Sequence, residues 1–498
     1  QKARSNKLSR SSHGISRPRN NDLSLQILKK GAQFHAEGHL DQAQAAYETI
    51  LKRFPNHSEA LYLLGTIAYE KKNFPLAIEL LKKSTQLNPH NCSALNNLGN
   101  ALKDSNRLEE ALEMYEKVIS LSPDFTASHN NMGLIFKSLG NIEQALVSYE
   151  RALEIQPDYV EAHWNKSLAL LLGGQLRKGF ELFEWRWKLQ KTELKPREFK
   201  APLWLGEQDL AGKTIMIHHE QGLGDGIQFC RYVPLLKELG ARVLLVVPKP
   251  LVTLMLSLQG ADEVIETGQA LPEFDFHCPM LSLPLAFKTD LSTIPLAQGY
   301  LSADPLKSEA WRKKLGEKRR LRVGVVWNGG AKAKESEFWS ANGRRNIELS
   351  EFAQALSGLD VDFYSLQKGD PAESEIRGRE REYWPKGNFF NFVDELHDFS
   401  DTAALVDNLD LVVAVDTSTA HLAAALGKPT WIVNRFDTCW RWLLQRSDSP
   451  WYAAVKLYRQ DQSKNWQSVL QQLTLGIQNL QQDGGQQYRP FKSDTNHV

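Results

Sequence analysis

Cysteine is scarce in this chain of 498 residues, which contains only four. They are Cys92, Cys230, Cys278 and Cys439. They lie far apart and form no C-x-x-C pair, so the sequence predicts neither a zinc site nor a disulfide framework. Thiols of this kind fit a reducing, cytoplasmic environment.

Long apolar runs and an excess of one charge are also missing. The best apolar runs, at 243–247 and 411–415, are much shorter than the roughly 18 residues that span a bilayer. The 60 Lys and Arg residues balance the 59 Asp and Glu residues. We therefore expect a soluble chain with no integral membrane association and no nucleic-acid partner. Residues 1–22 are basic and polar without an apolar stretch, which predicts a disordered tail rather than a signal peptide.

A period of 34 residues dominates the first part of the chain. Prolines, glycines and alanines each recur at this spacing: Pro55, Pro89, Pro123 and Pro157; Gly31, Gly65, Gly99 and Gly133; Ala43, Ala77, Ala111 and Ala145. The pattern resembles the tetratricopeptide repeat, in which small residues let the two helices of each repeat approach closely. The resemblance implies an α-solenoid over residues 23–190.

A fifth, degraded unit ends the repeats at about residue 187. It carries Ser167 and Gly179 where the family has glycine and alanine. Each repeat of a solenoid buries its face only on a neighbour, so the last one needs a cover. We expect this unit to cap the array or to dock it on the region that follows.

One asparagine recurs at the same phase of three repeats, as Asn97, Asn131 and Asn165. A row of amides on the inner face of the solenoid can hold an extended peptide backbone by paired hydrogen bonds. The resemblance to the asparagine ladder of O-GlcNAc transferases implies such a peptide-binding role. A structural role at this repeat position is the alternative.

Strands and helices alternate after a polar linker, residues 191–204. Apolar, β-branched runs lie at 214–218, 241–248, 263–266, 321–330, 362–367, 409–416 and 429–434. Such alternation predicts βαβ units on parallel sheets. We predict two doubly wound, Rossmann-like domains over residues 205–305 and 306–480, and a disordered tail over 481–498.

Two segments of this region resemble glycosyltransferases of the GT-B fold. QGLGDGIQFCRYVPLL (221–236) is similar to the glycine-flanked Gly-Asp near the start of heptosyltransferases, and VDTSTAHLAAALGKPTW (415–431) is similar to their D-[ST]-G-x-x-H-L-A-A-A-L-G-x-P segment. With 343–356 and 441–452, they make residues 205–480 similar to bacterial tetratricopeptide-containing glycosyltransferases, some of which modify flagellin. The resemblance implies two domains that face a cleft, with the nucleotide sugar held mainly by the second.

Asp225 opens a predicted helix among Gly222, Gly224 and Gly226. The dipole and N–H groups of a helix start favour the ionised carboxylate. The resemblance implies that this loop faces the acceptor and that Asp225 is the general base for the attacking hydroxyl. A cap that holds the turn is the alternative. The glycines permit a positive φ and a close approach of the backbone to substrate.

Asp416 ends a predicted buried strand, and Thr417, Ser418 and Thr419 open the next helix. N–H groups at such a start bind phosphate. The resemblance implies that Asp416 holds sugar hydroxyls and that the next residues take the diphosphate, although Ser418 replaces the family's glycine. His421 returns to the same helix face one turn later, where it either meets the nucleotide or is satisfied by backbone.

Cations near residue 340 complete the predicted donor site. Arg344 and Arg345, with Lys332 and Lys334, can neutralise a departing nucleoside diphosphate; a merely solvated basic loop is the alternative. The D-x-D pattern at 360–362 lies at the entry of a predicted strand, and no His or Cys cluster has ligand spacing. We expect no metal site.

Polar and aromatic residues follow the ends of two predicted strands. Trp327, Asn328 and Gln367 fall at the carboxyl edge of a parallel sheet, where open α/β folds bind ligands. Trp440 and Trp442 are expected to pack between the domains.

These features predict a cytoplasmic, metal-independent glycosyltransferase. Its nucleotide sugar is a co-substrate, so no separate cofactor is expected, and its acceptor is a protein recruited by the repeats. Asp225, Asp416 and His421 together favour an enzyme. Two alternatives stay open: a repeat adaptor whose transferase-like region only binds a nucleotide sugar, and a transferase that acts on a glycolipid.

Overall fold

The computed structural model describes residues 18–190, 196–330 and 343–482. It contains two compact units, Gln1–Ile135 and Phe136–Val498, and the division falls inside helix α7 (Thr126–Ser138). Among the described helices, none combines the length and the apolar character that crossing a membrane requires.

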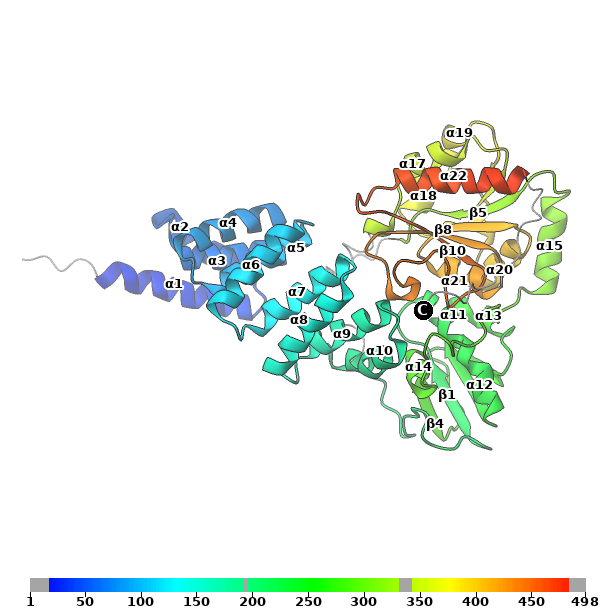
Figure 1. Ribbon diagram of the computed structural model, residues 1–498, viewed down its shortest axis with the longest axis horizontal. Helices are drawn as coiled ribbons and strands as arrows, with labels where there is room; N and C mark the ends of the chain where they lie inside the picture. Colours follow the sequence, from blue (N-terminus) through cyan, green and yellow to red (C-terminus); the bar gives the residue numbers. More distant parts are fainter. Residues whose placement is uncertain (1–17, 191–195, 331–342, 483–498) are drawn as a thin grey trace, which may run out of the picture. The chain divides into compact units, whose positions relative to one another are not determined.

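The first unit is built of antiparallel helix pairs (Figure 1). These are α1 (Pro18–Ala36) with α2 (Leu40–Arg53), α3 (Ser58–Glu70) with α4 (Phe74–Leu87), and α5 (Cys92–Asp104) with α6 (Leu108–Leu121). The phased residues make the contacts within each pair: a Cβ added to Gly99 would lie 2.5 Å from the ring of Tyr115. The predicted helical repeats are confirmed. Because α1 begins at Pro18, it overlaps the tail predicted to be disordered.

The second unit begins with the remaining repeat helices, α8 (Ile142–Ile155), α9 (Val160–Leu172) and α10 (Leu176–Phe183), and a 3₁₀ turn, η1 (Glu184–Lys188). The two residues that depart from the repeat pattern meet here, because the Ser167 hydroxyl donates a hydrogen bond of 2.8 Å to the carbonyl of Gly179. The division of the chain at Phe136 places these last repeat helices in the same compact unit as the α/β region.

A first parallel sheet follows. We call this sheet, together with the helices that pack on it, the N-lobe. Its strand order is β3 (Glu263–Glu266), β2 (Arg242–Val247), β1 (Thr214–His218), β4 (Phe276–Pro279). Its helices are α11 (Leu223–Phe229), α12 (Val233–Glu238), α13 (Lys249–Met255) and α14 (Leu283–Ala286), with 3₁₀ turns η2 (Cys230–Tyr232) and η3 (Met280–Ser282). Ile215 and Ile217 face the apolar cluster that these helices share, whereas Met216 on the opposite face packs with Phe199 and Phe274.

A second parallel sheet, with its helices, forms the C-lobe. Its strand order is β10 (Val455–Arg459), β9 (Thr430–Asn434), β8 (Leu411–Val415), β5 (Arg322–Val326), β6 (Asp362–Ser365), β7 (Phe389–Phe390). Helices α17 (Leu349–Leu356) and α22 (Gln467–Gln482) cover one face, and α20 (Phe399–Asp407) and α21 (Ser418–Ala425) cover the other (Figure 1). Strands β5, β8 and β9 are buried throughout, as a sheet covered on both faces requires.

Shorter elements complete the C-lobe: α15 (Pro305–Leu315), α18 (Ala372–Ile376), α19 (Glu380–Tyr383), η4 (Val393–Glu395) and η5 (Trp440–Trp442). The predicted succession of a helical solenoid and two parallel α/β sheets is confirmed. Strands β4, β7 and β10 were not predicted.

Candidate active site at the lobe junction

Helix α11 of the N-lobe meets helix α21 of the C-lobe, and we call this contact the lobe junction (Figure 1). Gly224 lies at its centre. A Cβ added there would lie 3.1 Å from Cδ2 of His421 and 3.3 Å from Cα of Ser418. The absence of a side chain at Gly224 therefore lets the starts of the two helices touch.

The three loop glycines act through close packing and not through a left-handed backbone. Gly222 has a φ of −88°, and neither Gly224 nor Gly226 is among the described glycines with positive φ. A Cβ on Gly226 would lie 2.7 Å from Cδ2 of His219. The positive φ that glycine permits is not used at these three positions, because they lie at the start of α11.

Asp225 is held on both of its carboxylate oxygens. Oδ2 accepts a hydrogen bond of 2.8 Å from the Gly222 amide, and Oδ1 accepts one from Nη2 of Arg441. Asp225 thus holds the first turn of α11 from inside the helix rather than from the N-cap position. Its side chain remains 17% exposed.

Arg441 lies in η5 of the C-lobe and reaches across to the N-lobe. Besides Asp225, its Nε donates a hydrogen bond of 2.7 Å to Oε1 of Gln228, and its guanidinium stacks 4.4 Å from the ring of Trp440. Burial is the largest single influence and lowers the pKa of Arg441, but the Asp225 carboxylate, Cys439 and Asp416 together outweigh it, so the pKa is raised. The sequence analysis did not predict a role for Arg441, because no motif distinguishes it from the other arginines of the chain.

A second buried arginine also joins the lobes. Arg231 of the N-lobe donates 2.6 Å to the carbonyl of Trp451 and 3.0 Å to the hydroxyl of Tyr300. Its guanidinium lies 4.6 Å from the ring of Tyr452. Two ionic or charge-assisted links, in opposite directions, therefore fix the junction.

An aromatic cluster seals the junction beside these links. Phe180 of α10 lies 6.5 Å from Phe229 of the N-lobe and 5.7 Å from Trp440 of the C-lobe, measured between ring centroids. Trp440 therefore packs between the lobes, as expected. Trp442 is fully buried and stacks on His421 at 5.2 Å. The last repeat thus contributes an apolar side chain to the core that both lobes share.

The start of α21 gathers the predicted donor-site residues within one turn. Thr417 is the N-cap, and its hydroxyl accepts from the Ala420 amide at 3.4 Å. Ser418 and Thr419 follow in the first turn, where backbone N–H groups have no acceptor within the helix. The Asp416 carboxylate lies 3.8 Å from Nε2 of His421. This geometry is suited to an anion, as a helix start is in general.

His421 is buried and bonded to a side chain. Its Nδ1 lies 2.8 Å from the hydroxyl of Tyr452. Burial lowers the pKa of His421 to about 4, so the imidazole is neutral at neutral pH. The bonded partner of Nδ1 is thus the Tyr452 hydroxyl and not the backbone, and contact with the nucleotide stays a prediction.

The two predicted arginines have different surroundings. Arg345 donates to the carbonyls of Asp416 (2.9 Å) and Gly329 (2.8 Å), and burial lowers its pKa below the usual value. It therefore connects the loops that follow β8 and β5. Arg344 is exposed and pairs with Asp437 at 2.5 Å. Lys332 and Lys334 lie outside the described residues.

The residues at the strand ends hold the sheet together. Trp327 is fully buried in the core of the C-lobe, and Gln367 is 1% exposed. Oε1 of Gln367 accepts from the amides of Trp327 and Asn328, and its Nε2 donates to the carbonyl of Asn328. The expectation of ligand contacts from Trp327 and Gln367 does not fit this geometry, because both side chains point into the interior. Asn328 is half-buried and accepts from the Gly330 amide.

The repeat asparagines bond to neighbouring repeats. In the first unit, Nδ2 of Asn97 donates 3.0 Å to the Thr66 hydroxyl, and Nδ2 of Asn131 donates 2.9 Å to Oδ1 of Asn100. Asn165 lies in the second unit, on α9. These bonds give Asn97 and Asn131 a structural role, and peptide binding stays a prediction.

Acidic side chains do not cluster into a ligand set in the part of the chain that the structure describes, where no three His, Cys, Asp or Glu residues could hold a metal ion. In the D-x-D pattern, Asp360 and Asp362 both pair with Arg320. Metal independence stays a prediction.

The lowered pKa of His421 gives a testable pH dependence. Below the ordinary histidine pKa of about 6.5 the unfolded chain binds a proton there, whereas the folded protein does not until about pH 4. Stability should therefore fall from pH 6.5 towards pH 4, by up to about 1.4 kcal/mol per pH unit from this group. Urea unfolding between pH 7 and 4.5 should show a shallower fall for His421→Gln. The control is His397→Gln, at an exposed position; equal slopes in all three proteins would contradict the assignment.

Comparison with protein families finds the repeats and one part of the C-lobe. Tetratricopeptide repeat models match residues 34–91, 99–140 and 133–173. The model of glycosyltransferase family 9 (heptosyltransferase) matches residues 373–432. That match includes the start of α21 and does not reach Asp225.

Individual proteins resemble parts of the chain. Protein FlbA of Caulobacter vibrioides is 25% identical over 339 residues, which are 62% of this chain and 54% of FlbA, so the chain spans about half the length of this relative. The crystal structure of MamA is 26% identical over 32% of this chain and 92% of MamA, with a TM-score of 0.29. TTC0263, a thermophilic TPR protein in Thermus thermophilus, is 23% identical over 34% of this chain and 93% of its own, with a TM-score of 0.30. The chain therefore resembles tetratricopeptide repeat proteins over its first helices and glycosyltransferase family 9 over residues 373–432.

Proposed function

We propose that this protein transfers a sugar from a nucleotide sugar to a protein acceptor that its repeats recruit. The observation that carries the proposal is the lobe junction. There the start of α21, inside the segment that matches glycosyltransferase family 9, lies against the helix that carries Asp225. An anion-binding helix start and a carboxylate that can accept a proton are what such a transfer needs.

The donor belongs at the start of α21. Its diphosphate would accept hydrogen bonds from the amides of Ser418 and Thr419, while Asp416 would accept from sugar hydroxyls. Two described cations act on Asp416: Arg345, which bonds to its carbonyl, and Arg441, whose pKa the Asp416 carboxylate helps to raise. Preorganised donors of this kind stabilise the charge that grows on a leaving diphosphate, so the reaction would proceed without a metal or a separate cofactor.

Asp225 would act as the general base. The acceptor hydroxyl oxygen attacks the anomeric carbon, the bond from that carbon to the diphosphate breaks, and Asp225 takes the hydroxyl proton. In the structure the Asp225 carboxylate is bonded to Arg441. A bound diphosphate is a competing anion for the same guanidinium, so donor binding would release the carboxylate from this ion pair and leave it open to the acceptor hydroxyl.

The same ion pair is the observation that favours a second candidate, a repeat adaptor that binds a nucleotide sugar without turnover. An Asp225 that stays bonded to Arg441 and Gly222 would cap α11 and accept no proton. Measurement of turnover separates the two candidates.

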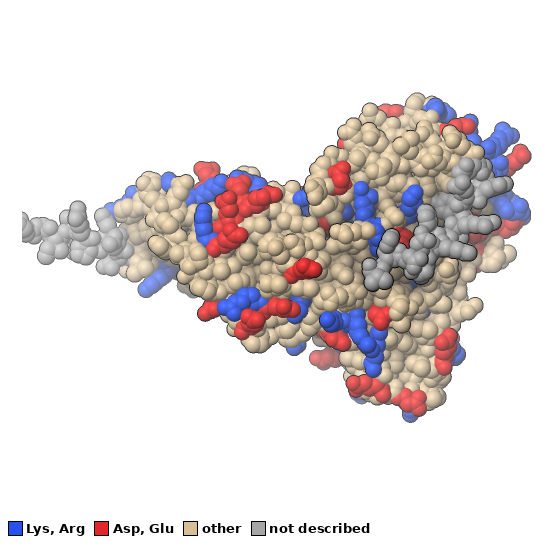
Figure 2. Space-filling model, in the orientation of Figure 1, with Lys and Arg blue, Asp and Glu red and all other residues tan. Residues whose placement is uncertain are grey.

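The acceptor side of the proposal rests on the repeats. Acidic and basic side chains are mixed on the visible face of the first unit (Figure 2), which suits a polar protein segment. The resemblance to transferases that modify flagellin makes flagellin the first acceptor to test. A cytoplasmic location follows from that role.

Replacement of Asp225 by Asn tests the base. Asn keeps the oxygen that accepts from the Gly222 amide, so α11 should stay intact, but it cannot take a proton. Transfer should fall by about 10² to 10⁴, with donor affinity little changed in calorimetric titration. Asp275→Asn is the matched control, because Asp275 also accepts from a backbone amide of the N-lobe but lies away from the junction. Near-normal release of nucleoside diphosphate by Asp225→Asn would leave only the capping role.

Replacement of Asn97 and Asn131 by Ala tests recruitment. If these amides also hold an acceptor backbone, the KM for flagellin should rise several-fold, while slow hydrolysis of the donor by water should not change, since the repeats raise the effective concentration of acceptor only. Asn88→Ala, at an exposed helix end, is the control. An unchanged KM would confine both asparagines to the inter-repeat bonds.

A further inference from the structure

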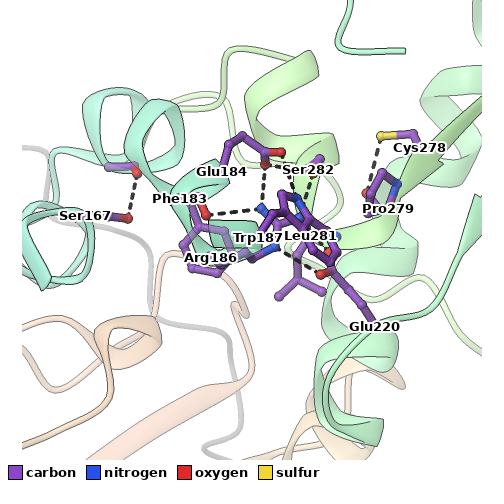
Figure 3. A network of polar contacts seen from close by, with 11 residues as sticks. Ser167, Phe183, Glu184, Arg186, Trp187, Glu220, Cys278, Pro279, Leu281 and Ser282 are labelled. Atoms are coloured by element: carbon purple, nitrogen blue, oxygen red, sulfur yellow. Dashed lines mark hydrogen bonds and ion pairs between the residues drawn. The ribbon is translucent and has the colours of Figure 1, made fainter. Parts of the chain in front are cut away.

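A buried arginine at the end of the repeats lies against the loop that leads to Asp225. Arg186, in η1, has no exposed surface. Figure 3 shows its guanidinium among Glu184, Glu220 and Ser282, which come from three separate segments. Burying a charge costs free energy unless the charge is paired and fully hydrogen-bonded. The partners of Arg186 must therefore account for its burial.

All five N–H groups of this guanidinium have acceptors. Nε and Nη2 bind the two carboxylate oxygens of Glu220 at 3.0 and 2.8 Å. Nη2 also donates 2.7 Å to the Ser282 hydroxyl, and Nη1 donates to Glu184 (2.6 Å) and to the carbonyl of Phe183 (3.2 Å). The fork geometry of arginine, which lysine lacks, is used completely.

Glu220 is fixed by the same network. Its side chain is 5% exposed, and it accepts a third hydrogen bond, from the Leu281 amide at 3.1 Å. It lies between strand β1 and Gly222, the N-cap of α11. Arg186 therefore fixes the point from which the chain turns into the helix of Asp225.

The residue between these two fixed points has a strained backbone. Gln221 has a φ of +63° although it is not glycine, and its side chain is exposed. Such a conformation persists only where the surroundings determine it. On one side the turn is held by the bidentate bonds to Glu220, and on the other by the bond from the Gly222 amide to Asp225.

We propose that Arg186 is a positioning residue of the transfer reaction: through Glu220 it fixes the left-handed turn at Gln221 and so places Asp225 at the lobe junction. The proposal rests on the base role of Asp225 argued above. It makes the last repeat a part of the catalytic machinery, since removal of η1 would free the turn. Arg186 touches neither Asp225 nor, on this account, any substrate.

The test is a double-mutant cycle between Arg186→Lys and Asp225→Asn. Lysine keeps the positive charge and loses the fork, so the fold should survive while the turn loosens. The kcat of Arg186→Lys should fall by about 10²-fold, as a misplaced catalytic group predicts, with the donor dissociation constant unchanged. In the Asp225→Asn background the same substitution should lower kcat by less than about 3-fold, because residues that act as one unit are not additive. Arg177→Lys, exposed on α10, should behave as wild type.

Hydrogen exchange supplies a readout that needs no activity. Amides of residues 221–226 should exchange faster in Arg186→Lys and in a second variant, Glu220→Gln, than in wild type, with the C-lobe unchanged. A full additive loss in the cycle, or unchanged exchange in both variants, would overturn the proposal. If Asp225→Asn turns over normally, the base assignment fails separately, and the exchange result alone then decides whether Arg186 places the turn.

Discussion

The contact between the starts of α11 and α21 is the constraint on which the arrangement of the two lobes depends. Gly224 permits it, since a Cβ there would meet His421 and Ser418. Once the two helix starts touch, the helix that carries Asp225 in one lobe and the first turn of α21 in the other lie together. Arg441 then has an acceptor in the opposite lobe, and Arg231 makes the reverse link to the Trp451 carbonyl. A buried charge that loses its partner strongly destabilises the fold. Each lobe therefore supplies the hydrogen-bond acceptor that the buried arginine of the other lobe requires.

The last repeat belongs to this construction. Phe180 packs on rings of both lobes, and Arg186 binds the loop before α11. The compact unit accordingly starts at Phe136, inside the repeats and far from the polar linker. The final repeat helices share the apolar core of the lobes, whereas the helices of the first unit have cores of their own. In the sequence this difference is marked by Ser167 and Gly179, which stand where the repeat family has glycine and alanine.

Much of the fold could be predicted, because its signals are local and repeated. The 34-residue spacing encodes contacts such as Gly99 on Tyr115, and the runs at 214–218 and 263–266 coincide with β1 and β3. Edge strands such as β7 escaped notice because they are short. The predicted turns at Asp225 and Asp416 do approach each other, and Arg345, which bonds to the Asp416 carbonyl, was among the predicted residues. The arginine partner of Asp225 could not be found, because it is 216 residues away and a buried arginine looks like a surface charge in sequence. Trp327 was predicted to face the ligand, but its side chain is buried in the core of the C-lobe. The sequence of a strand does not say which of its residues face the core when both faces are apolar.

The most direct test of a nucleotide-sugar site at the start of α21 is a thermal-shift comparison of wild type, Thr417→Asp and Thr417→Ser against a panel of nucleotide sugars. Asp and Ser both keep an N-cap acceptor for the Ala420 amide, but only Asp places a negative charge beside the diphosphate. A nucleotide sugar at 100 times its dissociation constant should stabilise the native protein by about 2.7 kcal/mol. The account predicts that the same sugar raises the Tm of wild type and Thr417→Ser and leaves that of Thr417→Asp unchanged. An equal rise in Thr417→Asp would contradict it and would place the donor elsewhere.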